Sequence, residues 1–308
     1  MPGAADWLAG LDLRSPAAVV RLFDDATAAN RQARCRRGAI DLIEPEGELI
    51  ATGDLHDNPA HLLAALQLAD LEGAGKGPRH ITLHEVIHGG RSMMDMDMSH
   101  RALARVAALK ARHPEHVHTL LANHELSQIV GLGVIKDGVR MTEAFNDGVR
   151  YVFADESTAV LEAIARFIRS MPLALISGRG TERGVLCAHS VPGPDLIDRF
   201  DEGVLDRDLT EEDLQPRRGS AHIMVWGRSH TPALLDHLAE RWGAPLFVLG
   251  HEKAPEGWMT VPDRAVVLNS DHEKGAVLRI DLAAPPPIPL ALDEPPPGLI
   301  RLTGDSAG

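Results

Sequence analysis

The sequence predicts one α/β domain in which a largely parallel first sheet packs against a second, mixed or antiparallel sheet. In the first half of the chain, strand-like apolar runs alternate with helical patterns, which is typical of parallel strands joined by helices. In the second half, short apolar runs follow one another with one clear helical pattern, at 232–242. With 308 residues, of which 44% are hydrophobic, the chain can bury one large core.

The first half begins with a helix signal, because Ser15 is a typical N-cap residue and Pro16 follows it. Residues 1–47 are therefore predicted to be an N-terminal helical segment packed on the domain. Strands are then predicted in the runs ELIATGD, HITLHEVIH and VHTLLANHE, with helices that begin at Asn58-Pro59 and at Ser99 between them. Residues 126–170 are predicted to be mostly helical.

The second half contains six short apolar runs that predict strands: PLALIS, VLCAHS, HIMVWG, LFVLGH, AVVLNS and AVLRID. Together with the first half they predict a main domain over 48–282. From residue 283 the sequence becomes rich in proline, which cannot propagate a sheet. Residues 283–308 are therefore predicted to be an extended C-terminal tail.

Composition excludes several classes of function. The net charge of −13 argues against binding to nucleic acid or to an anionic membrane, since both require clustered Lys and Arg. There are two cysteines, Cys35 and Cys187, in no metal-binding or disulfide pattern, and this fits a reducing cytoplasm. The first residues lack a signal-peptide pattern, and no apolar run approaches the length of a membrane span.

Polar residues follow the predicted strands at five places. The residues are Asp54 and His56, Glu85, Asn123 and His124, His189, and His251. Ligands in open α/β sheets collect at the carboxyl ends of strands, so we expect these side chains to meet. Oxygen and imidazole ligands without thiolate suit Mn, Fe or Zn, and their number suits two ions that share a carboxylate. Such a pair favours hydrolysis of a phosphoryl group.

The order of these motifs resembles that of the calcineurin-like metallophosphoesterases, and among them the serine/threonine phosphoprotein phosphatases. The family pattern GDxHG, GDxVDRG, GNHE, HGG and RAH corresponds to GDLHDN, LHEVIHGG, LANHE, CAHSVP and LGHEKAPEGW in this chain. The resemblance covers about residues 48–282. It implies a sandwich of two mixed β-sheets flanked by helices, with a dinuclear metal site at the strand ends.

The resemblance also implies roles for individual residues. One metal ion would take Asp54, His56 and Glu85, and the second would take Glu85, Asn123, His189 and His251. His124 would be the general acid that protonates the leaving oxygen, and a metal-bound hydroxide would attack phosphorus. No covalent phosphoenzyme is expected, because Cys187 lacks the loop of a cysteine phosphatase.

Two departures from the family pattern concern the metals and the acid. Glu85 stands where the family has a bridging Asp, so the metal positions are expected to differ slightly. His88 stands where the family has the Asp that supports the general acid. Because an imidazole cannot be an anionic partner, either Asp95 or Asp97 takes that role or His124 is a weaker acid.

A third departure concerns phosphate binding. The two arginines of the family motifs are absent, since Gly89 and Leu121 fall at their positions. Arg91 and Arg228 are the nearest candidates for a bidentate grip on phosphate.

The remaining histidines leave one alternative open. His230, in the run GRSH, competes with His251 for the last ligand position, because other calcineurin-like esterases use a GHTH motif. The closing strand pattern favours His251. His84, His88 and His100 are predicted to be structural residues or supporting neighbours rather than ligands.

These expectations converge on a cytoplasmic enzyme that hydrolyses phosphomonoesters with two divalent metal ions. The phosphoprotein-phosphatase type is favoured, with a phosphorylated substrate and an oligomeric state that the sequence does not predict. One alternative is a small-molecule phosphoesterase, for example a dinucleoside polyphosphate hydrolase. Another is a weakly catalytic metal-binding module whose Pro-rich tail docks an SH3-like partner.

Overall fold

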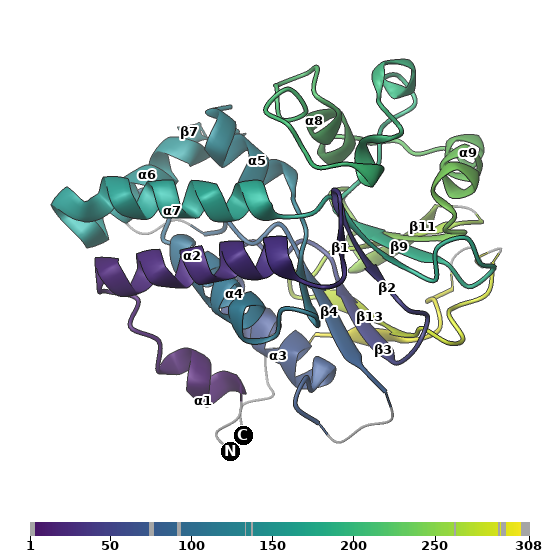
Figure 1. Ribbon diagram of the computed structural model, residues 1–308, viewed down its shortest axis with the longest axis horizontal. Helices are drawn as coiled ribbons and strands as arrows, with labels where there is room; N and C mark the ends of the chain where they lie inside the picture. The colour runs from purple at the N-terminus through teal and green to yellow at the C-terminus, as the bar shows by residue number, and fades with distance from the viewer. Residues whose placement is uncertain are drawn as a thin grey trace.

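The computed structural model describes residues 4–73, 77–90, 94–132, 134–136, 138–261, 263–288, 290 and 294–302. Two mixed sheets face each other, and most of the helices cover their outer sides (Figure 1). Leu49 and Leu278 of one sheet share a buried apolar layer with Cys187 and Val248 of the other. The two sheets therefore form the predicted sandwich. None of the described helices is long and apolar enough to cross a membrane.

The first sheet has five strands in the order β14-β13-β3-β4-β5. Its parallel centre is β3 (Glu48–Thr52), β4 (Arg79–Leu83) and β5 (Val117–Thr119), as predicted. Strand β13 (Ala276–Asp281) pairs antiparallel with β3, and β14 (Leu299–Arg301) pairs antiparallel with β13.

The second sheet has seven strands in the order β1-β2-β8-β9-β10-β12-β11. Their bounds are β1 Arg36–Arg37, β2 Ile40–Ile43, β8 Ala174–Ser177, β9 Val185–Ala188, β10 Leu246–Leu249, β11 Trp258–Val261 and β12 Ala265–Leu268. Strands β9, β10 and β12 run parallel, so their carboxyl ends lie at one edge. A separate ribbon pairs β6 (Ile135–Lys136) with β7 (Val139–Arg140).

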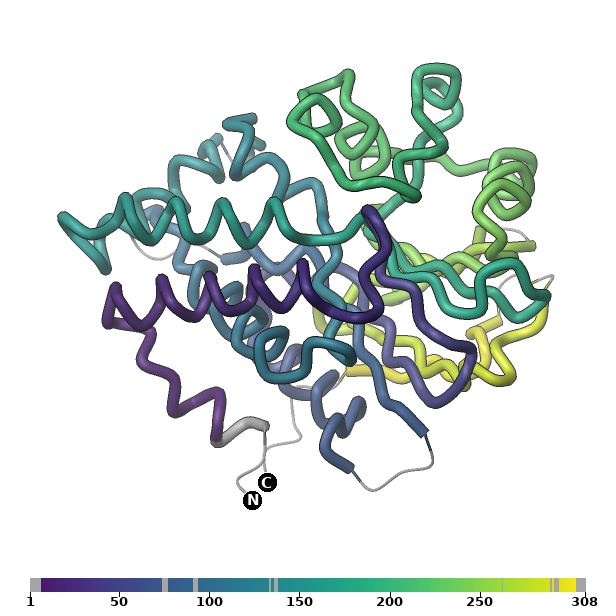
Figure 2. Tube along the Cα trace, viewed as in Figure 1, coloured from purple at the N-terminus to yellow at the C-terminus, as the bar shows by residue number. Residues whose placement is uncertain are grey.

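The helices follow the apolar periodicity of the sequence. They are α1 Ala4–Ala9, α2 Pro16–Gln32, α3 Pro59–Ala69, α4 His100–Arg112, α5 Asn123–Val130, α6 Met141–Phe153, α7 Ser157–Ser170, α8 Ser220–Val225 and α9 Pro232–Trp242, with 3-10 turns at Ala154–Glu156, Ile197–Arg199 and Val204–Asp206. Helices α2 and α7 run side by side (Figure 2).

Polar caps explain where several helices begin. The side chains of Ser15, Asn58 and Thr231 each accept a backbone N–H in the first turn, and a proline follows each of them. Ser99 behaves differently. Its side chain does not cap α4, because its hydroxyl accepts the backbone N–H of His88 at 3.1 Å.

Two expected strands are different in the structure. The run HIMVWG, expected as a strand, lies largely in helix α8, whose six residues are all buried. An apolar run with no polar face carries no period that separates a strand from a helix, so the prediction was wrong. The run AVLRID forms β13, but this strand joins the first sheet rather than the second.

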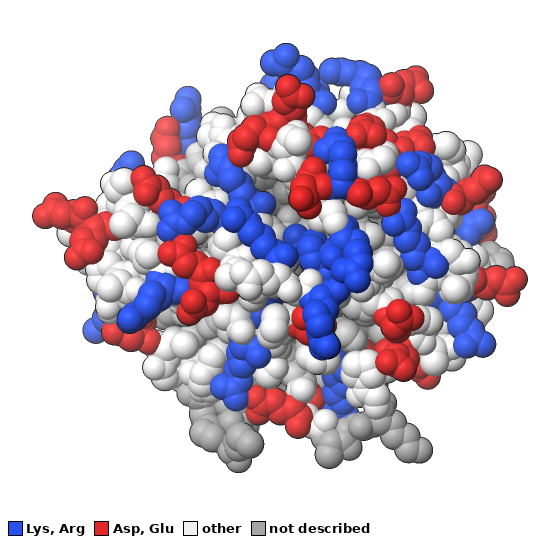
Figure 3. All heavy atoms as spheres, in the orientation of Figure 1, with Lys and Arg blue, Asp and Glu red and all other residues white. Residues whose placement is uncertain are grey.

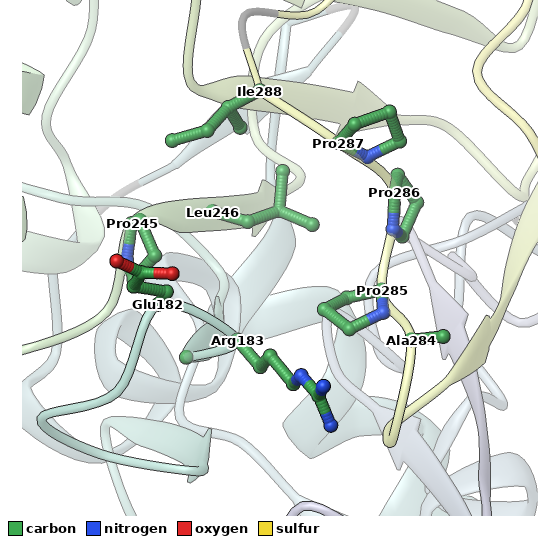
Figure 4. A pocket seen from close by; sticks show the side chains of 10 residues that line it. Glu182, Arg183, Pro245, Leu246, Ala284, Pro285, Pro286, Pro287 and Ile288 are labelled. Atoms are coloured by element: carbon green, nitrogen blue, oxygen red, sulfur yellow. The ribbon is translucent and has the colours of Figure 1, made fainter.

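The ends of the chain also contribute to the sheets. Residues 36–37 and 40–43, expected within the N-terminal helical segment, form β1 and β2 of the second sheet. The segment after 283 was expected as an extended tail, yet its residues 299–301 return to the first sheet as β14. Pro285, Pro286 and Pro287 lie opposite Leu246 and line a pocket of about 160 Å³ (Figure 4). The proline run therefore lies against the body of the protein.

Candidate metal centre

Loops that follow strands of both sheets place the candidate residues. Asp54 follows β3, Glu85 follows β4 and His251 follows β10. Asp54 also forms a parallel bridge with Asn269, which follows β12 of the other sheet. The carboxyl ends of the two sheets therefore meet at this point, as the sequence predicts.

Glycines allow this close approach. A Cβ atom on Gly53 would lie 2.1 Å from the carbonyl oxygen of Leu268, which belongs to the opposite sheet. A Cβ on Gly250 would lie 2.3 Å from Oδ1 of Asp54. Both distances are far below van der Waals contact, so a larger residue at either position would push the two strand ends apart.

Glu85 lies between two groups of polar side chains. Its Oε1 is 3.7 Å from Nε2 of His56 and 3.5 Å from Nε2 of His124. Its Oε2 is 3.8 Å from Nε2 of His189. The side chain is buried, in contrast to a carboxylate at a solvent-exposed strand edge. Its two oxygens therefore face different halves of the site.

The second of these groups contains Asp54, Asn123, His189 and His251, and its members lie closer together. Nε2 of His189 lies 2.7 Å from Oδ1 of Asn123 and 3.0 Å from Nδ1 of His251. Nδ1 of His189 lies 3.4 Å from Oδ1 of Asp54. The carboxylate of Asp54 accepts the backbone N–H of His251 at 3.0 and 3.1 Å, which fixes its orientation.

Hydrogen bonds to backbone carbonyls assign the tautomers of the imidazoles, because a carbonyl only accepts. Nδ1 of His56 lies 3.1 Å from the carbonyl oxygen of Ile87, so this nitrogen carries the proton. The Nε2 lone pair of neutral His56 then faces Glu85.

The tautomer of His189 follows from its hydrogen bond to the neighbouring His84. Nε2 of His84 donates to the carbonyl oxygen of Thr52 at 2.9 Å, so the Nδ1 of neutral His84 is an acceptor. It lies 3.2 Å from Nδ1 of His189, which must donate to it. The Nε2 lone pair of His189 therefore points toward Asn123 and His251.

Burial keeps the imidazoles in the neutral form that binds metals. It lowers the pKa of His84 to about 4 and that of His251 to about 2, so both imidazoles are neutral at pH 7. Burial and the carboxylate of Asp54 raise the pKa of Glu85 well above its ordinary value. A divalent cation beside Glu85 would favour its charged form again, and imidazole lone pairs with carboxylate oxygens are a donor set that fits such a cation.

The backbone is strained at the same place. His56, Glu85 and His251 have φ angles of 41°, 49° and 67°, although none is glycine. Non-glycine residues in this region are uncommon and cluster at functional sites.

The Nδ1 atom of His124 has an imidazole rather than a carboxylate as its hydrogen-bond partner. Its Nδ1 lies 2.9 Å from Nδ1 of His88, as expected from the position of His88 in the sequence. The two proposed substitutes do not contact His124: Asp97 accepts the backbone N–H of Ser99, and Asp95 is exposed. Burial, followed by the imidazoles of His56 and His88, lowers the pKa of His124 to about 2.

A pocket of about 230 Å³ opens onto these groups. Arg228 lines it and donates from Nη1 to the carbonyl oxygen of His251 at 2.8 Å, with Nη2 3.5 Å from Nδ1 of the same residue. Lys253 also lines it. His230 lies outside the lining residues, where its Nε2 donates to the carbonyl oxygen of Val191 at 2.9 Å. Arg91 lies outside the described residues.

Two further residues organise the site. His84, which the sequence predicts to be a structural residue or a supporting neighbour, lies within 4.8 Å of the donor atoms of Asp54 and His189. Glu125 was given no role, yet its Oε1 accepts the backbone N–H groups of Val86 and Ile87 at 2.7 and 3.2 Å. Its carboxylate therefore fixes the loop after Glu85.

No protein-family model and no curated protein sequence matches the chain. Solved structures do. A protein serine/threonine phosphatase from Saccharomyces cerevisiae matches with a TM-score of 0.60 at 15% identity, over 87% of this chain and 83% of that chain. A cold-active protein-tyrosine phosphatase of a psychrophilic Shewanella species matches with a TM-score of 0.52 at 16% identity, over 82% and 80%. The chain therefore has the fold of these phosphatases, and the predicted sandwich of two mixed sheets is confirmed.

Proposed function

We propose that the protein is a metal-dependent phosphoesterase that hydrolyses phosphomonoesters, of the serine/threonine phosphoprotein-phosphatase type. The observation that carries the proposal is the convergence of imidazole lone pairs and carboxylate oxygens around Glu85 in one pocket. The phosphatases that share the fold support it.

The residues that would hold the metals form two sets joined by Glu85. Asp54, His56 and Glu85 make up one set, and Glu85, Asn123, His189 and His251 make up the other. When bound, two divalent cations supply positive charge that neutralises a phosphoryl group and makes water more acidic. Manganese is the ion that we propose, with iron or zinc as alternatives.

The protein's own groups would position the substrate and move a proton. The guanidinium of Arg228 lies beside the metal-ligand candidates and lines the pocket, where such a group can hold two phosphate oxygens. His124 would protonate the leaving oxygen from Nε2, the ring nitrogen that faces Glu85. Its partner His88 is an uncharged imidazole, and burial lowers the pKa of His124 to about 2. His124 would therefore carry the proton less often at neutral pH than a histidine paired with a carboxylate, and would be a less effective proton donor.

The first experiment measures metal content and turnover together. Protein stripped with a chelator is reloaded with Mn²⁺, Fe²⁺ or Zn²⁺ and assayed on p-nitrophenyl phosphate. Asp54→Asn should lower metal occupancy and turnover. The matched control is Asp271→Asn, because Asp271 lines the same pocket but belongs to neither set. Absence of turnover with every metal would overturn the proposal.

A competition experiment identifies the substrate class. Phosphoserine and phosphothreonine peptides should compete with p-nitrophenyl phosphate more strongly than dinucleoside tetraphosphates do. The reverse order would favour a small-molecule phosphoesterase.

A further inference from the structure

A second pocket, of about 320 Å³, lies away from the candidate metal centre, and no residue lines both. The ends of α2 and α7, the turn after β1 and residues 208–209 form its walls. Figure 3 shows Lys and Arg side chains gathered at the centre of the face on which Figure 1 places β1 and the end of α2. Arg31, Arg36 and Arg169 line the pocket.

Arg36 contributes a guanidinium group of fixed position to the wall of this pocket. Its Nε donates to Oδ1 of Asp41 at 2.8 Å, and its Nη1 donates to the carbonyl oxygen of Ser170 at 3.0 Å. Its Nη2 is buried and has no hydrogen-bond partner among the described residues. The side chain is only 13% exposed, so water satisfies little of it. Because Nε and Nη1 are both bonded, the positive charge of this guanidinium is held at the pocket wall, where it attracts an anion.

The charge around Arg36 is not balanced. Asp41 faces two cations, because Nζ of Lys110 lies 3.9 Å from Oδ2 while Arg36 holds Oδ1. Arg31 has no ion-pair partner within the described part of the chain. Arg169 pairs with Glu211 at the surface, where such a contact is weak and readily exchanged.

The lining also offers apolar contact. Ala39 and Met171 are buried and Leu209 is half-buried beside the arginines. One acidic residue, Asp208, lines the pocket together with the three arginines. The volume lies at the lower end of the range for small-molecule pockets, about 300–1,000 Å³.

We propose that this pocket binds the phosphate group of a small phosphorylated molecule. Arg31, Arg36 and Arg169 surround the anion, since planar guanidinium groups match phosphate oxygens. The organic part of the ligand packs on Met171 and Leu209. The site is independent of the proposed phosphoesterase activity.

The test is isothermal titration of metal-free protein, kept in chelator so that no ester is turned over, with inorganic phosphate and with phenyl phosphate. The test variants are Arg31→Gln, Arg169→Gln and their combination, since both side chains are exposed and neither supports the core. Arg34→Gln is the matched control, because Arg34 belongs to the same basic run but does not line the pocket. Arg228→Gln reports binding at the candidate metal centre.

We expect saturable binding that the double variant weakens at least about 10-fold and that Arg34→Gln and Arg228→Gln leave unchanged. Phenyl phosphate should bind several-fold more tightly than inorganic phosphate. Absence of saturable binding, or weakening by Arg228→Gln alone, would overturn the site. If phenyl phosphate and inorganic phosphate bind with equal affinity, the proposed contact with the organic part of a ligand is wrong, and the pocket is a site for free phosphate. If the double variant shows no melting transition, it does not fold. The two single variants then test the site in its place.

Discussion

Replacing His84 tests how the candidate metal centre is organised. Its imidazole connects the carbonyl oxygen of Thr52 to Nδ1 of His189, and this chain leaves the Nε2 lone pair of His189 free. His84→Leu removes one acceptor and leaves the N–H of His189 with Oδ1 of Asp54, 3.4 Å away. The ring orientation of His189 is then fixed less firmly.

The expected magnitude follows from the role of such partners. Losing the group that accepts the second N–H of a ligand imidazole typically weakens metal binding about 10–100-fold. Since each factor of ten corresponds to about 1.4 kcal/mol, the loss is about 1.4–2.8 kcal/mol. The lost hydrogen bond adds about 0.5–1.5 kcal/mol of destabilisation to the metal-free fold. His84→Asn should recover much of the affinity, because the amide oxygen can accept near the position of Nδ1.

The assay is Mn²⁺ affinity, measured by competition with a chelator, alongside thermal unfolding of the metal-free proteins. His100→Leu is the matched control, because His100 is a buried histidine whose ring nitrogens have no hydrogen-bond partner among the described residues. It should leave the affinity unchanged. If His84→Leu binds Mn²⁺ as tightly as wild type, the assigned tautomer of His189 is wrong.

Other predictions concern the acid and the fold. His124→Asn should slow turnover about 100-fold or more with metal content near wild type; loss of both metals would make His124 a ligand. His88→Asp should raise the pKa of His124, so turnover on phenyl phosphate relative to p-nitrophenyl phosphate should rise about 10-fold; an unchanged ratio contradicts this. Gly53→Ala should destabilise the fold by about 1–3 kcal/mol, because its Cβ would meet Leu268, and an unchanged melting temperature would refute it.

The sequence predicts the parallel centre of the first sheet because its strands are short apolar runs bounded by polar turns. It fails where that local signal is missing. Helix α8 is buried on every side, so nothing in its pattern distinguishes it from a strand. Residues 299–301 were grouped with the prolines before them, although they contain none and pair with the otherwise open edge of β13.

The site illustrates the same limit at the level of single residues. A strand predicted through residue 88 would place His84 and Glu85 on opposite faces, since side chains alternate along a strand. The strand ends at Leu83 instead, and the positive φ of Glu85 turns the chain so that both side chains reach the site. Order along the sequence identified Glu85, whereas only the backbone conformation shows that His84 supports His189.

Several features of this site are unfavourable when each is considered alone. Burial and the nearby carboxylate of Asp54 disfavour the charged form of Glu85. The positive φ of Glu85 adds an estimated ~1–3 kcal/mol of strain. The carboxylate of Glu125 holds the loop that follows, and the close contact at Gly53 fixes the opposite sheet. The fold holds these unfavourable groups at the strand ends. Folding therefore already includes the cost of ordering the side chains, so a cation would find its ligands in place.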